Sequence, residues 1–279
     1  MKVAVIGLGL IGGSMALALK DKNLASSLVG VDANPEHQQK ALALGLVDAV
    51  AGMEEAVDAS DLIVLAVPVN IASQLIVPLL NRLTHQVLFD VGSTKQSICT
   101  AADASPNRNR FVATHPMWGT EYSGPGSAVH GAFENKAVVI CNSDDSDADA
   151  LEKTAAIYQA LGMHLLYMDA AAHDIHAAYI SHISHISSFA LANTVLEKER
   201  EDNAIFEMAS GGFESTVRLA KSNPEMWMPI FMQNRENVLD VLNEHISQLR
   251  KFKSSLEKED EGFLLELINN ANRIRRIIK

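Results

Sequence analysis

Residues 3–13 read Val-Ala-Val-Ile-Gly-Leu-Gly-Leu-Ile-Gly-Gly, and this stretch decides the fold that we predict for the chain. An apolar run typical of a buried strand leads directly into Gly7-x-Gly9-x-x-Gly12, and an apolar helical pattern follows. In such a strand–turn–helix unit, the first glycine permits the tight turn, the second lets backbone N–H groups approach a pyrophosphate, and the third lets helix and strand pack closely. We therefore predict a dinucleotide site at this turn. The residues expected to contact the cofactor are Gly7, Gly9, Leu10, Ile11 and Gly12.

An acidic residue occupies the position that this glycine pattern requires for ribose recognition. Asp32 lies 20 positions after Gly12, at the end of the second predicted strand. A carboxylate there accepts hydrogen bonds from the ribose hydroxyls of NAD and repels the 2′-phosphate of NADP. The next residues, 33–35, include no Arg or Lys to hold that phosphate, so we predict NAD as the cofactor. Val67 and Pro68 follow the third predicted strand, where the nicotinamide half of the cofactor usually lies.

Short apolar runs alternate with helical patterns over the first 168 residues. The predicted strands are 3–6, 28–32, 62–66, 87–90, 111–114, 137–141 and 163–168. The predicted helices between them are 13–20, 35–44, 53–59, 71–82 and 147–161. Strands buried on both faces and separated by helices predict an α/β domain of the Rossmann type, with a mostly parallel sheet, over residues 1–168.

The remainder of the chain, 169–279, predicts an all-helical domain. The expected helices are 170–201, 203–221, 224 to about 256, and 261–279. No linker rich in Pro, Gly or Ser separates the two domains, so we expect a tight junction that holds the site. Long helices with apolar faces in a small domain often pack against a symmetric copy, and we predict a homodimer through these C-terminal helices.

Bulk composition excludes several classes of partner. The formal net charge of −11 argues against nucleic acid or an anionic membrane surface as the main partner. Two cysteines, Cys99 and Cys141, make neither a disulfide framework nor a metal cluster, so we predict a cytoplasmic protein. Four glycines interrupt the apolar N-terminal run, and no later stretch is long and apolar enough to span a membrane.

Three polar segments carry the residue types that active sites use. They are Asp-Val-Gly-Ser-Thr-Lys at 90–95, Thr-His-Pro-Met-Trp-Gly-Thr-Glu at 114–121, and a His-Asp pair at 173–174 followed by Ser-His-x-x-His at 181–185. Together with Gly-Gly-Phe at 211–213 and Arg218, this set resembles the prephenate/arogenate dehydrogenase family of tyrosine biosynthesis. The resemblance covers essentially the whole chain. It implies a homodimer that binds the small molecule prephenate and converts it to 4-hydroxyphenylpyruvate by oxidative decarboxylation, with reduction of NAD.

The resemblance also implies roles for single residues. His115 matches the catalytic histidine, which is suited to accept the proton of a substrate hydroxyl because a histidine is neutral near physiological pH. Ser93 matches a serine that hydrogen-bonds this histidine and the substrate hydroxyl. Arg218 matches an arginine that binds a substrate carboxylate, and Glu121 matches an acidic residue near the site entrance.

The histidine-rich segment is expected to line the substrate pocket. His185 matches a family histidine near the substrate side chain, and Ser181 and His182 match its neighbours. Histidines on one helical face also bind metals, but no cysteine or carboxylate cluster with ligand spacing accompanies them, so we predict no metal. Asp174 is expected to orient the helix or another histidine.

Two departures from the family pattern bear on the substrate. Ile183-Ser184 stands where Leu-Pro is common, and Glu214-Ser215 stands where Arg-Asp is frequent. The missing carboxylate at Ser215 removes a partner for a substrate ammonium, which favours prephenate over the amino acid arogenate. The alternatives are an arogenate dehydrogenase, a β-hydroxyacid or imine-type dehydrogenase, and a non-catalytic NAD-sensing protein. The chain contains no obvious regulatory domain, and it gives no basis for predicting feedback control by tyrosine.

Overall fold

The computed structural model of the protein describes residues 1–199 and 205–277. It divides into two compact units, Met1–Asn234 and Arg235–Lys279, and each is described by itself. The domain boundary predicted near residue 168 is not tested by this division and stays a prediction.

The first unit is built on a single sheet, which has eight strands in the part of the chain that the structure describes. They are β1 (Lys2–Ile6), β2 (Ser27–Val31), β3 (Ala49–Val50), β4 (Leu62–Leu65), β5 (Val87–Asp90), β6 (Phe111–Pro116), β7 (Ala137–Cys141) and β8 (His164–Met168). Their order is β3-β2-β1-β4-β5-β6-β7-β8, and neighbours are parallel except for β6 and β7. This confirms the predicted mostly parallel sheet. The two-residue strand β3 was not predicted, because it is too short to leave an apolar pattern.

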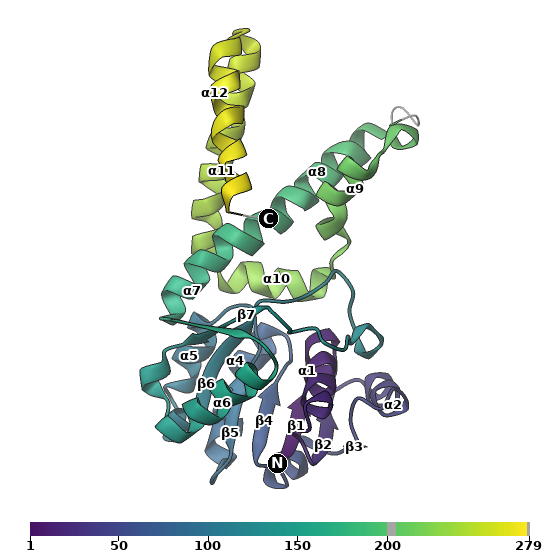
Figure 1. Cartoon of the computed structure of the whole chain (residues 1–279), viewed down its shortest axis with the longest axis vertical. Coiled ribbons are helices and arrows are strands. Elements are labelled where there is room, and N and C mark those ends of the chain that lie inside the picture. Colours follow the sequence, from purple (N-terminus) through teal and green to yellow (C-terminus); the bar gives the residue numbers. More distant parts are fainter. Residues whose placement is uncertain (200–204, 278–279) are drawn as a thin grey trace. The chain divides into compact units, whose positions relative to one another are not determined.

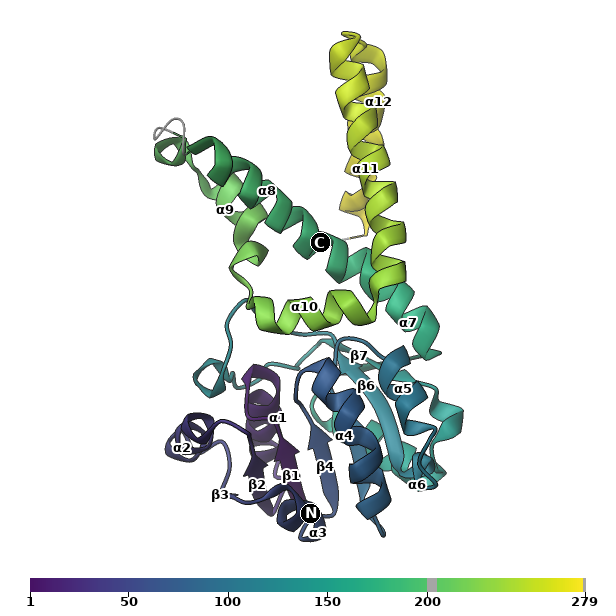
Figure 2. The same cartoon turned by 180° about the vertical axis from the view of Figure 1, so that it is seen from behind.

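Helices cover both faces of the sheet (Figure 1 and Figure 2). Alternate side chains of each strand point to opposite faces, so Val3 and Val5 belong to one core cluster while Ala4 and Ile6 belong to the other. The first cluster includes α1 (Leu10–Asp21), α2 (Pro35–Ala43) and α6 (Ala148–Ala160); the second includes α3 (Met53–Asp58), α4 (Val69–Arg82) and α5 (Gln96–Ala102). Each buried Val, Leu or Ile contributes about 1.5–3 kcal/mol, so these two clusters supply most of the stability of the layer structure.

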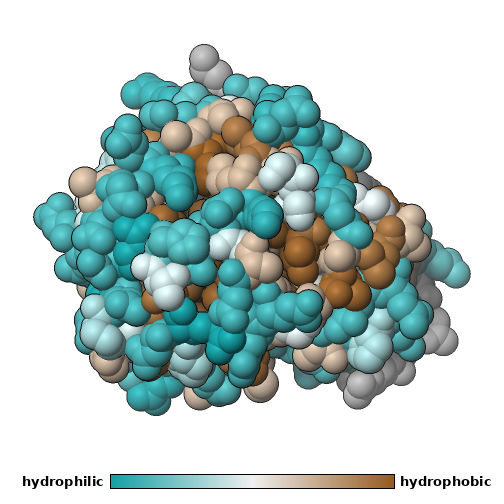
Figure 3. All heavy atoms as spheres, turned by 90° about the horizontal axis from the view of Figure 1, so that it is seen from below, coloured by the Kyte–Doolittle hydropathy of each residue, from teal (hydrophilic) through white to brown (hydrophobic). Residues whose placement is uncertain are grey.

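The strand register brings the carboxyl ends of the central strands level with one another. Ile6 of β1 pairs with Val31 of β2 and with Leu65 of β4, and Leu65 in turn pairs with Asp90 of β5. The loops that follow these strands therefore start at one edge of the sheet, which is where ligands bind in doubly wound folds. Seen from below, the molecule presents a mainly hydrophilic surface with scattered hydrophobic patches (Figure 3).

The helical segment of the first unit is more broken than predicted. It contains α7 (Ala170–Ala177), a π-helical turn (Ala178–His182), α8 (Ile183–Glu199), α9 (Gly211–Val217) and α10 (Pro224–Gln233), with 3₁₀ turns at Phe206–Met208 and Arg218–Lys221. The single helix predicted for 203–221 is wrong over the described residues. Ser210 is extended, and the glycine pair that follows is a poor helix former, so the chain restarts there as α9. Residues 203 and 204 lie outside the described residues.

The second unit consists of α11 (Arg235–Glu257) and α12 (Glu261–Asn272), followed by a 3₁₀ turn at Arg273–Arg276. Asp260 caps α12, because its side chain accepts a hydrogen bond from Phe263 N at 3.0 Å. The uninterrupted helix predicted from residue 224 to about 256 is wrong, since Asn234 leaves the helical conformation between α10 and α11. Across the described residues, we find no helix with the length and apolar character needed to cross a membrane.

Candidate active site

The glycine turn between β1 and α1 has the geometry that its sequence requires. Gly7 adopts a φ of +96°, and a Cβ added there would lie 2.5 Å from the carbonyl oxygen of Ala66. A Cβ at Gly12 would lie 1.9 Å from the carbonyl oxygen of Gly7. Neither position therefore accepts a side chain without movement of the backbone.

The same turn leaves space for a ligand. A Cβ at Gly9 would meet no heavy atom within 4 Å. Gly9 is the N-cap of α1 and, having no side chain, does not cap the first N–H groups of the helix at Leu10 and Ile11. The N–H groups at a helix N-terminus bind anions such as a pyrophosphate, and a glycine at the N-cap lets the anion approach them closely.

Asp32 stands beside this turn, directly after β2. Its Oδ2 accepts a hydrogen bond from Leu8 N at 2.8 Å, and its Oδ1 accepts one from Asn34 N at 2.9 Å. The carboxylate is thus fixed at the sheet edge, as ribose recognition requires, and it also fastens the glycine turn to β2. Next to the turn, Ala66 is followed by Val67 and then by Pro68, the N-cap of α4. These residues fit the NAD site that the sequence predicts.

His115 lies on β6 and takes part in a chain of three side chains. Its Nδ1 lies 2.8 Å from Nε2 of His173, and Nδ1 of His173 lies 2.8 Å from Oδ1 of Asp174. The imidazole of His115 is half-buried, whereas His173 and Asp174 are almost fully buried. Burial, followed by the nearby His173, holds the pKa of His115 well below its usual value, so the ring is neutral at physiological pH.

Asp174 connects this chain to the loop after β5. Its two carboxylate oxygens accept hydrogen bonds from Lys95 N at 2.8 Å and Gln96 N at 3.0 Å, which caps α5 from a residue on α7. Its backbone carbonyl accepts a hydrogen bond from Nδ2 of Asn234 at 2.6 Å. The expectation that Asp174 orients another histidine is confirmed by its contact with His173.

Ser93 lies in the loop that Asp174 holds, half-buried between Gly92 and Thr94. Lys95 ties this loop to the ends of β5 and β6, because its buried ammonium pairs with Asp90 and donates a hydrogen bond to the carbonyl oxygen of Thr114 at 2.7 Å. Within residues 1–199 and 205–277, no hydrogen bond joins Ser93 to His115, whose Nδ1 faces His173. The role that the resemblance implies for Ser93 stays a prediction.

The two charged residues predicted for substrate binding form an ion pair with each other. Nη1 of Arg218 lies 2.8 Å from Oε2 of Glu121, although the residues are 97 positions apart. The side chain of Arg218 is half-exposed, and that of Glu121 is mostly covered. Hydrogen bonds from its own backbone N–H and from Arg218 lower the pKa of Glu121, which keeps the carboxylate charged.

Aromatic side chains surround the remaining two histidines. His185 stacks on Trp227, with ring centroids 3.5 Å apart, and its Nδ1 donates to the carbonyl oxygen of Ser181 at 3.0 Å. Burial lowers the pKa of His182 to about 4 and also lowers that of His185. Nε1 of Trp227 is buried and has no hydrogen-bond partner among the described residues. Trp227 lies on α10, and the sequence carries no signal for its stacking on His185.

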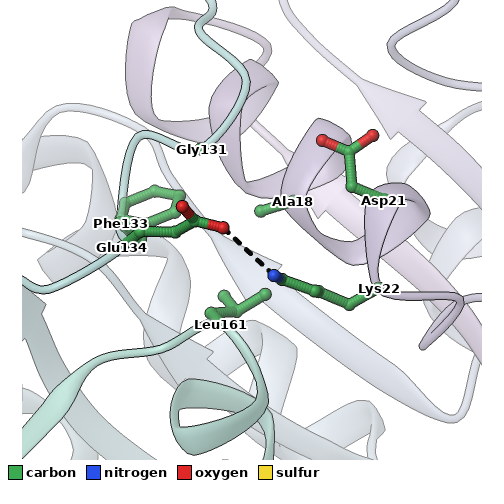
Figure 4. Close-up of a pocket in the computed structure, with 7 residues that line it drawn as sticks. All are labelled: Ala18, Asp21, Lys22, Gly131, Phe133, Glu134 and Leu161. Carbon is green, nitrogen blue, oxygen red and sulfur yellow. Dashed lines mark hydrogen bonds and ion pairs between the residues drawn. The ribbon is translucent and has the colours of Figure 1, made fainter.

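Two cavities lie away from these residues. One, of about 40 Å³, lies beside the carboxyl end of α1, where Lys22 and Glu134 form an ion pair (Figure 4). The other, of about 200 Å³, is lined by apolar residues of α8, α9 and the segment between them. The first is too small for a dinucleotide and lies at the opposite end of α1 from the glycine turn. No group of three or more His, Cys, Asp or Glu side chains that could hold a metal occurs in the part of the chain that the structure describes.

Comparisons with known proteins point to one and the same family over nearly the whole chain. Two family models match, prephenate dehydrogenase nucleotide-binding domain over residues 15–167 and prephenate dehydrogenase dimerization domain over residues 169–270. The chain is 32% identical to a prephenate dehydrogenase of Bacillus subtilis, over 98% of this chain and 75% of that protein. It is 30% identical to a cyclohexadienyl dehydrogenase of Zymomonas mobilis, over 99% and 96% of the two chains. The structure is similar to that of the Aquifex aeolicus prephenate dehydrogenase in complex with hydroxyphenyl propionate and NAD+, with a TM-score of 0.91, 29% identity and coverage of 100% and 99%.

Proposed function

Because this chain belongs to the prephenate dehydrogenase family, we propose that it oxidises and decarboxylates prephenate to 4-hydroxyphenylpyruvate. It is an NAD-dependent dehydrogenase. Bound NAD supplies the acceptor for a hydride that leaves the ring carbon bearing the hydroxyl group. The observation that carries the proposal is the position of a neutral, half-buried His115 near the end of β6, in the same sheet as β1, the strand that leads into the glycine turn.

His115 acts as the acceptor for the substrate hydroxyl. As the hydride leaves the carbinol carbon, the O–H proton shifts toward the imidazole, and the ring carboxylate departs as carbon dioxide. The electron pair of the broken carbon–carbon bond completes the aromatic ring. The proton then returns to the phenolic oxygen, so the reaction consumes and releases no net proton. The low pKa of His115 ensures that the ring starts each cycle in its accepting form.

Arg218 holds the substrate carboxylate end in this proposal, and Glu121 is its ion-pair partner near the site entrance. A guanidinium binds a carboxylate best in a bidentate arrangement, and Nη1 of Arg218 is engaged by Glu121. The substrate carboxylate therefore competes with Glu121 for this guanidinium. The proposal assigns contacts with the substrate side chain to His185 on α8 and to Ser181 and His182 in the π-helical turn before it.

The choice of prephenate over arogenate rests on α9. Ser215, at the position where an aspartate is frequent, directs its hydroxyl to the carbonyl oxygen of Gly212 at 2.9 Å. It offers no negative charge to the ammonium group of arogenate, whereas the keto group of prephenate needs none. A neighbour in structure is named an arogenate dehydrogenase, from Synechocystis, with a TM-score of 0.76, so arogenate is the alternative to test.

We also propose a cytoplasmic homodimer that assembles through the C-terminal helices. The second matching family model is described as a dimerization domain. Several large apolar side chains of the helical segments are exposed in the single chain, which is typical of surfaces that a second copy covers. They include Ile180, Met228, Met232, Leu256 and Leu265.

A steady-state assay with prephenate and with arogenate, each supplied with NAD and with NADP, tests the proposal. We expect NADH formation with prephenate and NAD, and a far lower kcat/KM for the other three combinations. Equal kcat/KM for arogenate would contradict the role given to Ser215. Binding of NAD without turnover of either substrate would support the non-catalytic alternative.

A further inference from the structure

The protons in the chain from His115 to Asp174 can be placed from hydrogen-bonding rules. An ionised carboxylate has acceptor sites only. Asp174 uses them for Lys95 N, for Gln96 N and for Nδ1 of His173, at 2.8, 3.0 and 2.8 Å. Nδ1 of His173 must therefore carry the hydrogen in this contact.

The second ring follows from the first. In a neutral imidazole one nitrogen carries the hydrogen and the other accepts. With its hydrogen on Nδ1, His173 accepts at Nε2, and the atom that faces Nε2 at 2.8 Å is Nδ1 of His115. His115 then donates from Nδ1 and leaves Nε2 bare. A positively charged His173 would impose the opposite arrangement, with the hydrogen of His115 on Nε2.

We propose that His173 and Asp174 are positioning residues that keep the hydrogen of His115 on Nδ1, so that Nε2 receives the hydroxyl proton of the substrate. The inference rests on the role of His115 in the proposed function. The two rings are tilted by 69° with centroids 5.0 Å apart, and Nδ1 of His115 and Nε2 of His173 meet at their edges. Asp174 is itself fixed, because it caps α5 and its carbonyl holds Asn234.

The same chain stabilises the proton once it has moved. Burial makes a cationic His115 unfavourable, and this is the main reason for its low pKa. When Nε2 takes the proton, Nδ1 continues to donate to His173, whose Nδ1–H continues to donate to the carboxylate of Asp174. No bond is broken between the three groups, and the negative charge of Asp174 faces the new positive charge through one polarisable ring. In analogous triads, losing the carboxylate that sets the tautomer lowers kcat about 10⁴-fold.

Nitrogen-15 NMR of the protein labelled at histidine tests the inference without any substrate. We expect His115, identified by the signal that disappears in His115→Gln, to show a protonated Nδ1 and a bare Nε2 at neutral pH. A protonated Nε2 in the wild-type protein would overturn the proposal. Because the measurement needs no turnover, it stays informative even if the wild-type protein fails to oxidise prephenate, which would overturn the proposed function instead.

Two variants test whether the pair sets this state. His173→Ala retains the cap that Asp174 gives to α5 and opens a space of the size of an imidazole. We expect kcat to fall roughly 10²- to 10⁴-fold, as for loss of general-base catalysis, with the dissociation constant of NAD unchanged. Added imidazole should restore at least part of kcat. His176→Ala is the matched control, because His176 is an exposed histidine on the same helix α7.

Asp174→Asn adds a distinct signature. An amide that presents its NH₂ group to His173 forces Nδ1 of His173 to accept, and the hydrogen of His115 then moves to Nε2. We expect this shift in the NMR spectrum together with a loss of kcat of similar size to that of His173→Ala, and no further loss in the double variant. Two results would overturn the proposal. One is a double variant in which the losses of kcat from the two single variants add. The other is a loss of kcat in His173→Ala that added imidazole does not restore and that parallels a fall in melting temperature. If Asp174→Asn does not fold, His173→Ala and the wild-type spectrum decide the matter.

Discussion

Replacing Gly9 with alanine separates cofactor binding from folding, because the structure places no atom where the new methyl group would go. A Cβ at Gly9 meets nothing within 4 Å, whereas a Cβ at Gly12, three residues later, would lie 1.9 Å from the carbonyl oxygen of Gly7. Gly9 has a φ of −74° and a ψ of −162°, which any residue adopts. Alanine at Gly9 should therefore fold, and alanine at Gly12 should force the turn apart.

The two substitutions should change different quantities: Gly9→Ala the affinity for NAD, and Gly12→Ala the free energy of unfolding. For Gly9→Ala, loss of a favourable N-cap costs up to about 1 kcal/mol. Alanine also leaves the unfolded chain fewer conformations than glycine does, which offsets this cost by about 0.4–1 kcal/mol. The free energy of unfolding should therefore barely change. The methyl group occupies the approach of the pyrophosphate to the N–H groups of α1. Losing one such charge-assisted hydrogen bond, worth about 1.5–3 kcal/mol, raises the dissociation constant of NAD roughly 10- to 100-fold. For Gly12→Ala, we expect destabilisation by about 1–3 kcal/mol or more, as for overpacking.

Titration calorimetry with NAD and scanning calorimetry of the free protein measure the two quantities. Gly52→Ala is the matched control, because Gly52 is the N-cap of α3, with a φ of −64° and a ψ of 153°, and its Cβ position is also open. It should leave NAD affinity unchanged. Unaltered NAD affinity in Gly9→Ala, or a loss of stability in Gly9→Ala as large as that in Gly12→Ala, would refute the reasoning.

The remaining predictions concern charge and protonation. Asp32→Ala should weaken NAD binding and relax the rejection of NADP, measured as the ratio of kcat/KM values for the two cofactors; an unchanged ratio would contradict the role of Asp32. Arg218→Ala should raise KM for prephenate roughly 10- to 100-fold with a smaller fall in kcat, since it removes a charge-assisted contact, and a lower kcat at constant KM would argue against carboxylate binding. Burial holds the pKa of His182 at about 4, below its unfolded value, so the folded state binds fewer protons than the unfolded state under acid conditions. Stability should therefore fall by about 3 kcal/mol from this residue as pH drops from 6.5 to 4, and urea unfolding of His182→Gln should show a smaller drop over that window.

The parallel sheet could be predicted because its strands carry their own signal. The runs Val87–Asp90 and Ala137–Cys141 are apolar on both faces except for Asp90, and the structure has strands at these same residues. Asp32 could be placed for the same reason, since the glycine pattern fixes its distance along the chain. In each case a local pattern determines a local structure.

The breaks between helices could not be predicted, because their causes are distant in sequence. Asn234 ends α10 in the middle of an apolar helical pattern, and its side chain is held by the carbonyl of Asp174, 60 residues away. The short helix α5 was also missed, since its N-terminus is capped by Asp174 and not by a residue of its own. In both cases, hydrogen bonds between segments distant in sequence determine where a helix begins or ends.

The partners of His115 were the main gap in the predicted site. The resemblance pointed to Ser93, while the structure places His173 against His115. The His-Asp pair at 173–174 was visible in the sequence, yet spacing along a helix gives no indication that its imidazole faces a strand 58 residues earlier. Similarly, Arg218 and Glu121 were each predicted for the site, but their mutual ion pair appears only in the folded chain.

The most direct test of the account is turnover by His115→Asn, measured as NADH formation from saturating prephenate, with NAD binding measured on the same preparation. Asparagine retains a polar side chain but cannot take the hydroxyl proton. The account predicts a kcat lower by about 10²- to 10⁴-fold, with the dissociation constant of NAD and the melting temperature close to those of the wild type. A variant that turns over prephenate at the wild-type rate would contradict the account.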